Sequence, residues 1–167
     1  MTAPRLLDST ASAPDTTTGR IDGIFITTAA GQPMIPLQSV HAIAGTGLEG
    51  DRYALGTGFY SDGSDGRELT LIEQEDLEQL AGKGVALAPH ECRRNLVTSG
   101  VRLQPLVGTR FFVGEVECEG VRLCPPCNHL EELTRPGPLR GLARSGGLRA
   151  RILTGGRIAV GDSVRQA

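Results

Sequence analysis

The stretch FFVGEVECEGVRLC, residues 111–124, indicates most directly which kind of fold this chain adopts. Apolar and polar residues alternate along it, as they do in strands that bury one face. The pair Glu119-Gly120 suits the tight turn of a β-hairpin. We therefore expect an antiparallel hairpin that turns at this pair. Its core-facing residues would be Val116 and Cys118 on the first arm, and Val121 and Leu123 on the second.

Short apolar stretches bounded by turn residues recur on both sides of this hairpin, and their lengths suit strands. They are IDGIFITTA (21–29), MIPLQSVHAI (34–43), RELTLI (67–72), RNLVTSG (94–100), LRARILTGG (148–156) and RIAVGDSV (157–164). Helical signals are fewer. EQEDLEQLAGKG (73–84) has acidic residues in its first turn and Gly82 as a terminator, and HLEELTR (129–135) and LRGLAR (139–144) could each form one or two turns. The pattern predicts a mainly β (α+β) fold, a barrel or sandwich with a few short helices.

The length of 167 residues suits a single domain. Residues 1–19 are rich in Ser, Thr, Ala and Pro and are expected to form a flexible tail, which leaves residues 20–167 as the domain. No run approaches the roughly 20 apolar residues that cross a membrane, and the N-terminus does not resemble a signal peptide. We therefore expect a cytoplasmic protein with reduced thiols.

The basic residues are almost all arginine. Lys83 is the single lysine among 17 basic residues, and the formal net charge is −2. A nucleic-acid-binding protein would normally carry an excess of positive charge, whereas arginine suits bidentate binding of phosphate or carboxylate. The composition therefore favours a small anionic ligand over nucleic acid.

The segment RLCPPCNHL, residues 122–130, permits three interpretations. Cys124 and Cys127 could form a redox pair, although the preceding strand is not the usual context for one. They could be half of a zinc site that Cys92 and His90 would complete. Alternatively, Cys127 alone could present a thiolate to a soft metal centre. The residues by themselves do not choose among these three.

Five blocks in order resemble the MOSC domain family over roughly Arg20 to Val164. They are GLEGDRYALGTG (47–58), GRELTLIEQEDL (66–77), ECRRNLVTSGVRLQPLVGTRFFVGEV (91–116), RLCPPCNHLEEL (122–133) and GGLRARILTGGRIAVGDSV (146–164). The resemblance implies a barrel-like β fold that binds the molybdenum cofactor (molybdopterin), a pterin dithiolene with a phosphate tail. It also implies a cysteine thiolate as molybdenum ligand.

Carried onto this sequence, the resemblance assigns the molybdenum ligand and catalytic thiolate to Cys127, with Cys124 and His129 close by. In CRRNLVT it places Arg93, Arg94 and Asn95 at the cofactor. Strand alternation would let only one of these two arginines face a pocket.

The block GLEGDRY has a structural and a functional interpretation. Its glycines suit a turn that Asp51 caps. The resemblance adds Glu49, Asp51 and Arg52 as pocket residues, with Arg52 holding an anion. In RELT it adds Arg67 and Thr70 as further cofactor-binding candidates, although strand propensity explains Thr70 equally well.

The implied function is that of a small molybdoenzyme that reduces N-hydroxylated compounds with electrons from an external flavin or iron–sulfur reductase. The alternative is a carrier of the cofactor or of persulfide sulfur on Cys127, and a purely structural domain ranks third. MOSC domains are also associated with pyridoxal phosphate. The sequence argues against that cofactor because a Schiff base needs a lysine, and Lys83 follows a predicted helix end.

Overall fold

The computed structural model describes residues 18–59 and 66–167, so the predicted tail lies outside the described residues apart from Thr18 and Gly19, which begin the first strand. The strands are β1 Thr18–Ile26, β2 Ile35–Leu37, β3 Ser39–Ile43, β4 Gly47–Leu48, β5 Leu69–Glu73, β6 Leu96–Ser99, β7 Arg110–Val113, β8 Val116–Leu123, β9 Leu148–Ile152, β10 Gly156–Ala159 and β11 Ser163–Gln166. The helices of the described residues are α1 Arg52–Leu55, α2 Gln74–Gly82, α3 Asn128–Leu133 and α4 Pro138–Gly141, with 3₁₀ turns at Pro89–Cys92 and Gln104–Leu106.

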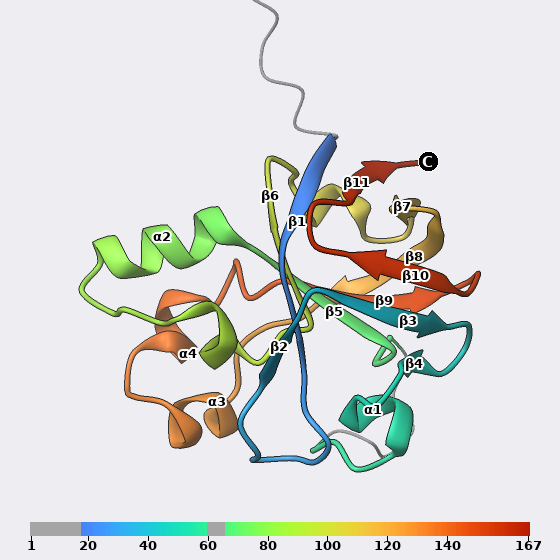
Figure 1. The fold of residues 1–167 in the computed structure, drawn as a ribbon. Helices are drawn as coiled ribbons and strands as arrows, with labels where there is room; N and C mark the ends of the chain where they lie inside the picture. Colours follow the sequence, from blue (N-terminus) through green and yellow to red (C-terminus); the bar gives the residue numbers. More distant parts are fainter. Residues whose placement is uncertain (1–17, 60–65) are drawn as a thin grey trace, which may run out of the picture.

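Seven strands close into a barrel (Figure 1), in the order β11-β7-β8-β9-β5-β6-β1. Pairing between β1 and β11 closes the ring, and β2 extends the sheet beyond β1. A smaller sheet, β10-β3-β4, accompanies the barrel. The predicted mainly β, barrel-like fold with a few short helices is confirmed.

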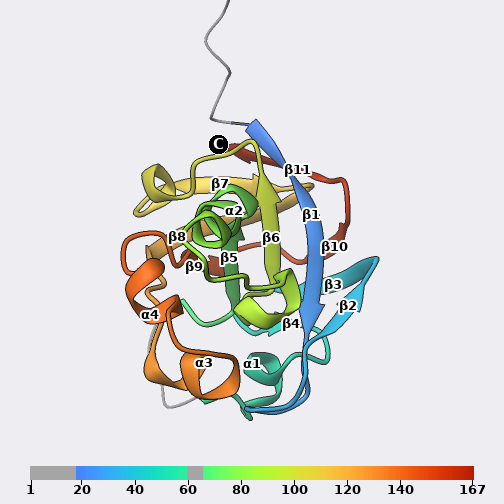
Figure 2. The ribbon, with the colours of Figure 1, turned by 90° about the vertical axis from the view of Figure 1, so that its left-hand side faces the viewer.

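Strand alternation divides the apolar residues between two cores. Leu69 and Leu71 of β5 and Leu148 and Ala150 of β9 point into the barrel and are fully buried. Residues of opposite parity, such as Ile72, pack outside the barrel against α2 and against Leu142, the residue that follows α4. Figure 2 views this outer face, with α2 in front of β5 and β6.

The hairpin exists, but the predicted turn position was wrong. The chain turns at Gly114-Glu115 between β7 and β8, where Gly114 has φ 58°. Gly120 lies within β8 instead, because its missing Cβ leaves room for the carbonyl oxygen of Leu106. A glycine in this sequence therefore marked a close approach of two backbones rather than a turn.

The burial predicted for the first arm of that hairpin is confirmed, whereas the burial predicted for the second is not. Val116 and Cys118 are fully buried, so Cys118 is a core residue as expected. Val121 is half-buried and Leu123 is 37% exposed. The reason for Val121 is the position of the turn: because the chain turns before β8, Val121 lies on the same strand as Val116 and Cys118 at opposite parity and faces away from the barrel core.

The expected helix after β5 is confirmed as α2, and the two short helical stretches predicted near 129–135 and 139–144 are α3 and α4. No helix within the described ranges is long and apolar enough to span a membrane. In both views α1 and α3 lie at the same end of the barrel, opposite the C-terminus (Figures 1 and 2).

Candidate functional site

A cavity of about 190 Å³ opens between the barrel wall and the segments around α1 and α3. Among the described residues that line it, five are arginines and none is Asp or Glu. The lining residues are Ala30, Arg52, Tyr53, Phe59, Thr70, Arg93, Arg94, Arg122, Cys124, Pro125, Pro126, Cys127, His129, Leu130 and Arg149. The cavity is thus strongly cationic and carries thiol groups on one side.

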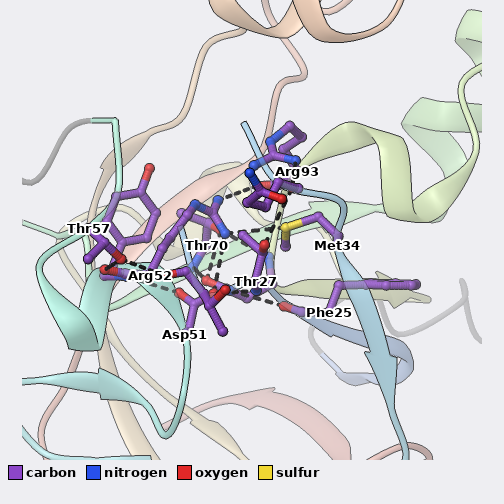
Figure 3. Close-up of polar contacts among 12 residues, drawn as sticks. Phe25, Thr27, Met34, Asp51, Arg52, Thr57, Thr70 and Arg93 are labelled. Carbon is purple, nitrogen blue, oxygen red and sulfur yellow. Dashed lines mark hydrogen bonds and ion pairs between the residues drawn. The ribbon is translucent and has the colours of Figure 1, made fainter. Parts of the chain in front are cut away.

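Arg52 is held by a dense polar network next to the cavity (Figure 3). Asp51 caps α1 and is fully buried, and its Oδ1 accepts from the Thr27 amide at 3.2 Å and from Arg52 Nη1 at 3.3 Å. Arg52 Nη2 donates to the Arg93 carbonyl at 2.9 Å. The predicted turn with Asp51 as cap is confirmed, with Gly50 at φ 81°. Asp51 therefore fixes the Arg52 guanidinium rather than facing the cavity itself.

Arg94 is buried, and its guanidinium binds backbone carbonyls. Nε donates to Gly146 O at 2.9 Å, Nη1 to Cys92 O at 3.3 Å and Nη2 to Cys124 O at 3.0 Å. These carbonyls come from three separate segments of the chain. Arg94 thus links three segments of the cavity wall and adds positive charge to the cavity.

Arg93 also lines the cavity, so the alternation argument for this pair does not apply. Both arginines precede β6, and Arg93 has a left-handed backbone with φ 62° directly after a 3₁₀ turn. Its Nη1 donates to Gln32 O at 2.7 Å. Burial, and then the neighbouring charge of Arg52, lower the pKa of Arg93 below its usual value. Two guanidinium groups therefore share one small volume, which favours the arrival of an anion.

The two thiols of CPPC lie along an extended segment between β8 and α3. Cys124 is buried, whereas Cys127 is half-buried and precedes the first residue of α3. Residues 124–127 contain no turn or bend. Each residue before a proline favours extended backbone, and three steps of polyproline-like chain span about 9 Å. A disulfide requires Cα atoms less than about 7 Å apart, so this geometry disfavours a redox pair.

The zinc interpretation gains no support from the described part of the chain. No group of three or more His, Cys, Asp and Glu side chains there lies close enough together to hold a metal ion. Cys92 is buried and is not among the residues that line the cavity, and its Sγ donates to Pro89 O at 2.9 Å. Burial raises the pKa of the Cys92 thiol. Cys127 is the partly exposed cysteine in the cavity, which agrees with the third interpretation.

His129 forms part of an aromatic wall. Its ring stacks on Phe59 with centroids 4.1 Å apart and an interplanar angle of 11°. Burial, and then the charge of Arg93, lower the pKa of His129. The neutral imidazole is therefore favoured at neutral pH, and this wall adds apolar surface rather than another charge.

Asn95 and Thr70 belong to one interlocked pair in the barrel wall. Asn95 is fully buried; its Oδ1 accepts from the Thr70 amide at 3.2 Å and from Thr70 Oγ1 at 3.1 Å. Its Nδ2 donates to Phe25 O at 3.1 Å. Thr70 lines the cavity, whereas Asn95 lies behind it and joins β5, β6 and β1. The expected contact of Asn95 with a ligand therefore remains a prediction, and its observed bonds are structural.

Seven of the predicted site residues line the cavity, whereas Arg67, Asn95, Glu49 and Asp51 do not. The residues that line the cavity are Arg52, Thr70, Arg93, Arg94, Cys124, Cys127 and His129. Arg67 and Asn95 are not among its lining residues, and Glu49 faces a different groove beside His41 and Arg157. Arg122 and Arg149 line the cavity, although no motif in the sequence singled them out. The signal that would have found them is strand pairing, which the sequence alone does not display.

Comparison with known proteins gives a consistent result. The family model described as MOSC domain matches residues 60–165, more than half of the chain. A search of curated proteins found no significant match. Among solved structures, the YuaD protein from Bacillus subtilis superposes with a TM-score of 0.74 at 18% identity, covering 88% of this chain and 94% of that one. YiiM from Geobacillus stearothermophilus superposes with a TM-score of 0.66 at 14% identity, covering 89% of this chain and 75% of that one. YiiM from Escherichia coli superposes with a TM-score of 0.64 at 17% identity, covering 89% of this chain and 69% of that one. At these identities the structural likeness concerns the fold alone.

Proposed function

Because the chain belongs to the MOSC domain family, we propose that its cavity binds the molybdenum cofactor, with the Cys127 thiolate as molybdenum ligand, and that the protein reduces N-hydroxylated compounds. The observation that carries this proposal is the meeting of one partly exposed thiol with five arginines in a cavity whose described lining residues include no acid.

The donor set of the cavity fits such a group. A soft thiolate is a suitable ligand for a metal that is otherwise held by dithiolene sulfurs. A phosphate tail is a suitable partner for guanidinium groups, which bind oxyanions through parallel N–H donors. Cys127 would hold the metal, and Arg93 and Arg52 would add positive charge that favours the phosphate. When bound, the cofactor supplies two-electron redox chemistry, and an external flavin or iron–sulfur reductase supplies the electrons.

The residues of this chain would position the ligand and control its surroundings. Arg94 anchors the Cys124–Pro125 segment through two carbonyls and thereby fixes where the chain presents Cys127. The stacked Phe59 and His129 rings form one side of the cavity. The Arg52–Asp51 network keeps a cation in place without requiring a ligand to order it.

Metal analysis of the protein from a host that makes the cofactor tests the proposal. We expect stoichiometric molybdenum and benzamidoxime reduction in the wild type. Cys127→Ser should lose both because an alkoxide is a poor substitute for a soft ligand. Cys124→Ser is the matched control and should retain most of both. Equal loss in the two variants would contradict the assignment of Cys127, and cofactor bound without turnover would favour the carrier function instead.

A further inference from the structure

Two arginines lie directly opposite each other in the barrel wall. Arg122 of β8 pairs with Arg149 of β9 in antiparallel register. Residues in such a position have Cβ atoms about 4.5–5.5 Å apart, and like charges there destabilise a sheet. Both side chains line the cavity. An anion that binds between the two guanidinium groups would offset their repulsion.

A β-bulge gives Arg122 this position. Val116 and Gly120 of β8 face the barrel interior, and simple alternation would place Arg122 on the same inner face. The register shifts between Gly120 and Arg122, so that one step along β9 matches two along β8. Arg122 thereby comes opposite Arg149 on the outer face of the wall. Bulges commonly re-aim a side chain next to a functional site.

The surroundings strengthen the attraction for an anion. Arg149 pairs on its other side with Thr70 of β5, which also lines the cavity. Arg149 is 8% exposed, so its charge acts in a medium of lower dielectric constant than water. None of the described lining residues is acidic. An oxyanion at this point would interact with two guanidinium groups at once.

We propose that Arg122 and Arg149 form an oxyanion subsite for the phosphate group of a phosphate monoester. The planar guanidinium fork matches the oxygens of phosphate, and a dianion balances two cations. The subsite requires only these two side chains and the bulge that aligns them, so it stands independently of molybdenum. The phosphate could belong to a cofactor or to a substrate, and the chemistry of recognition is the same.

Titration with inorganic phosphate tests the subsite directly. The full-length chain is purified from cells that cannot make the molybdenum cofactor and is melted in increasing phosphate at constant ionic strength, set with chloride. Phosphate should raise the melting temperature of the wild type. Arg122→Gln should weaken the apparent phosphate affinity at least about tenfold, because a charge-assisted interaction is lost. The control is Arg140, an exposed residue of α4 that does not line the cavity. Arg140→Gln removes the same charge, and its melting temperature should respond to phosphate like that of the wild type.

The same variants show whether Arg122 is merely structural. Without phosphate and at low salt, Arg122→Gln should melt at or above the wild-type temperature, since the like-charge repulsion is relieved. Arg122→Lys keeps the charge and serves as a second folded variant, with an intermediate phosphate response. Equal phosphate stabilisation in the wild type and in Arg122→Gln would overturn the proposal.

Two further measurements identify the source of the phosphate. In protein loaded with cofactor, loss of molybdenum in Arg122→Gln assigns the subsite to the cofactor's phosphate. Retained molybdenum, with a raised KM for an N-hydroxylated nucleoside monophosphate but not for the nucleoside, assigns it to the substrate. Cys127→Ser should keep inorganic phosphate binding while losing molybdenum. Failure of the molybdenum proposal is thereby distinguished from failure of the oxyanion subsite.

Discussion

Among single residues, Arg94 connects several separate segments of the chain. Its guanidinium binds carbonyls that precede β6, follow β8 and precede β9, so one side chain joins three segments at the cavity. Arg93, its neighbour, directs its guanidinium to Gln32 O and is half-buried at the cavity surface. The two adjacent arginines therefore have different roles. Arg94 holds segments of the cavity wall together, whereas Arg93 lies at the cavity surface, where a ligand would bind.

This difference predicts different effects of removing each charge. Arg94→Gln should lower the free energy of unfolding by about 2–4 kcal/mol, because buried carbonyls lose their donors. Arg93→Gln should change that free energy by less than about 1 kcal/mol and instead weaken cofactor binding by about 1.5 to 3 kcal/mol. Urea denaturation and cofactor occupancy measure the two effects. Similar stability losses in both variants would show that the division of roles is wrong.

Asp76 is a second residue of interest, because its environment should make the stability of the protein depend on pH. It lies in the first turn of α2 and is 7% exposed. Burial, and then the negative charge of Glu73, raise the pKa of Asp76 from 3.8 to about 6. The folded chain thus binds more protons than the unfolded chain between these two values. Stability should fall as the pH rises from about 4 to 6 and level off above.

Asp76→Asn should remove this dependence. Above pH 6 the variant is expected to be more stable than the wild type, by about 1–3 kcal/mol, because the ionised carboxylate is no longer buried. Below pH 4 the two proteins should melt alike. Thermal melts across this range, with Glu78→Gln on the same helix as control, measure the effect. A variant that is less stable at pH 7.5 would indicate that the carboxylate is stabilising instead.

At the scale of elements, the segment between β8 and α3 separates the two thiols that the sequence places close together. Pro125 and Pro126 keep the backbone extended, and Arg94 binds the carbonyls of Cys124 and Pro125. The segment is therefore held in a form that presents the two sulfurs separately. This arrangement suits a single thiolate ligand better than dithiol chemistry.

Oxidation of the native protein should accordingly produce no disulfide between Cys124 and Cys127. Treatment with oxidised glutathione and intact-mass analysis would show glutathione adducts on Cys127, the half-buried thiol, rather than the loss of two hydrogens. The same treatment in urea serves as the control, because the unfolded chain can bring the thiols together. A mass loss of two hydrogens in the native wild type, absent from Cys124→Ser, would refute the extended geometry.

At the scale of the whole molecule, the barrel depends on contacts between the two ends of the domain. Thr18, Gly19 and Arg20 of β1 pair with residues of β11 in antiparallel register. The same β1 pairs further along with β6, so it bridges the last strand and the middle of the chain. Closure also buries Val164 of β11 completely. The first strand is consequently part of the closed structure from its first described residue.

Two truncations test where the domain begins. Removal of residues 2–16 should leave the melting temperature and cofactor content unchanged, because that stretch lacks an apolar periodicity. Removal of residues 2–20 should lower the melting temperature markedly, because it deletes the pairing of β1 with β11. A clear loss of stability or of molybdenum in the shorter truncation would show that the N-terminal stretch belongs to the domain.

The positions of most strands and of α2 could be predicted from the sequence because they follow from local patterns. Alternation predicted strands such as β5 and β9, and acidic residues followed by Gly82 predicted α2. Cys127 could also be singled out, from a short motif and its resemblance to a family. These features depend on residues close together in the chain, so the sequence displays them directly.

Only the tertiary structure decided the turn of the hairpin and the opposition of Arg122 and Arg149. Gly120 lies within a strand because the Leu106 carbonyl approaches it, and the register shift beside it reverses the face on which Arg122 lies. Arg94 likewise binds carbonyls up to 52 positions away in the sequence. Such features depend on which distant segments pack together, and a one-residue change of register moves a side chain to the opposite face of a sheet. Local sequence patterns therefore determined which segments form strands and helices. The pairing register of distant segments determined which side chains meet in the cavity.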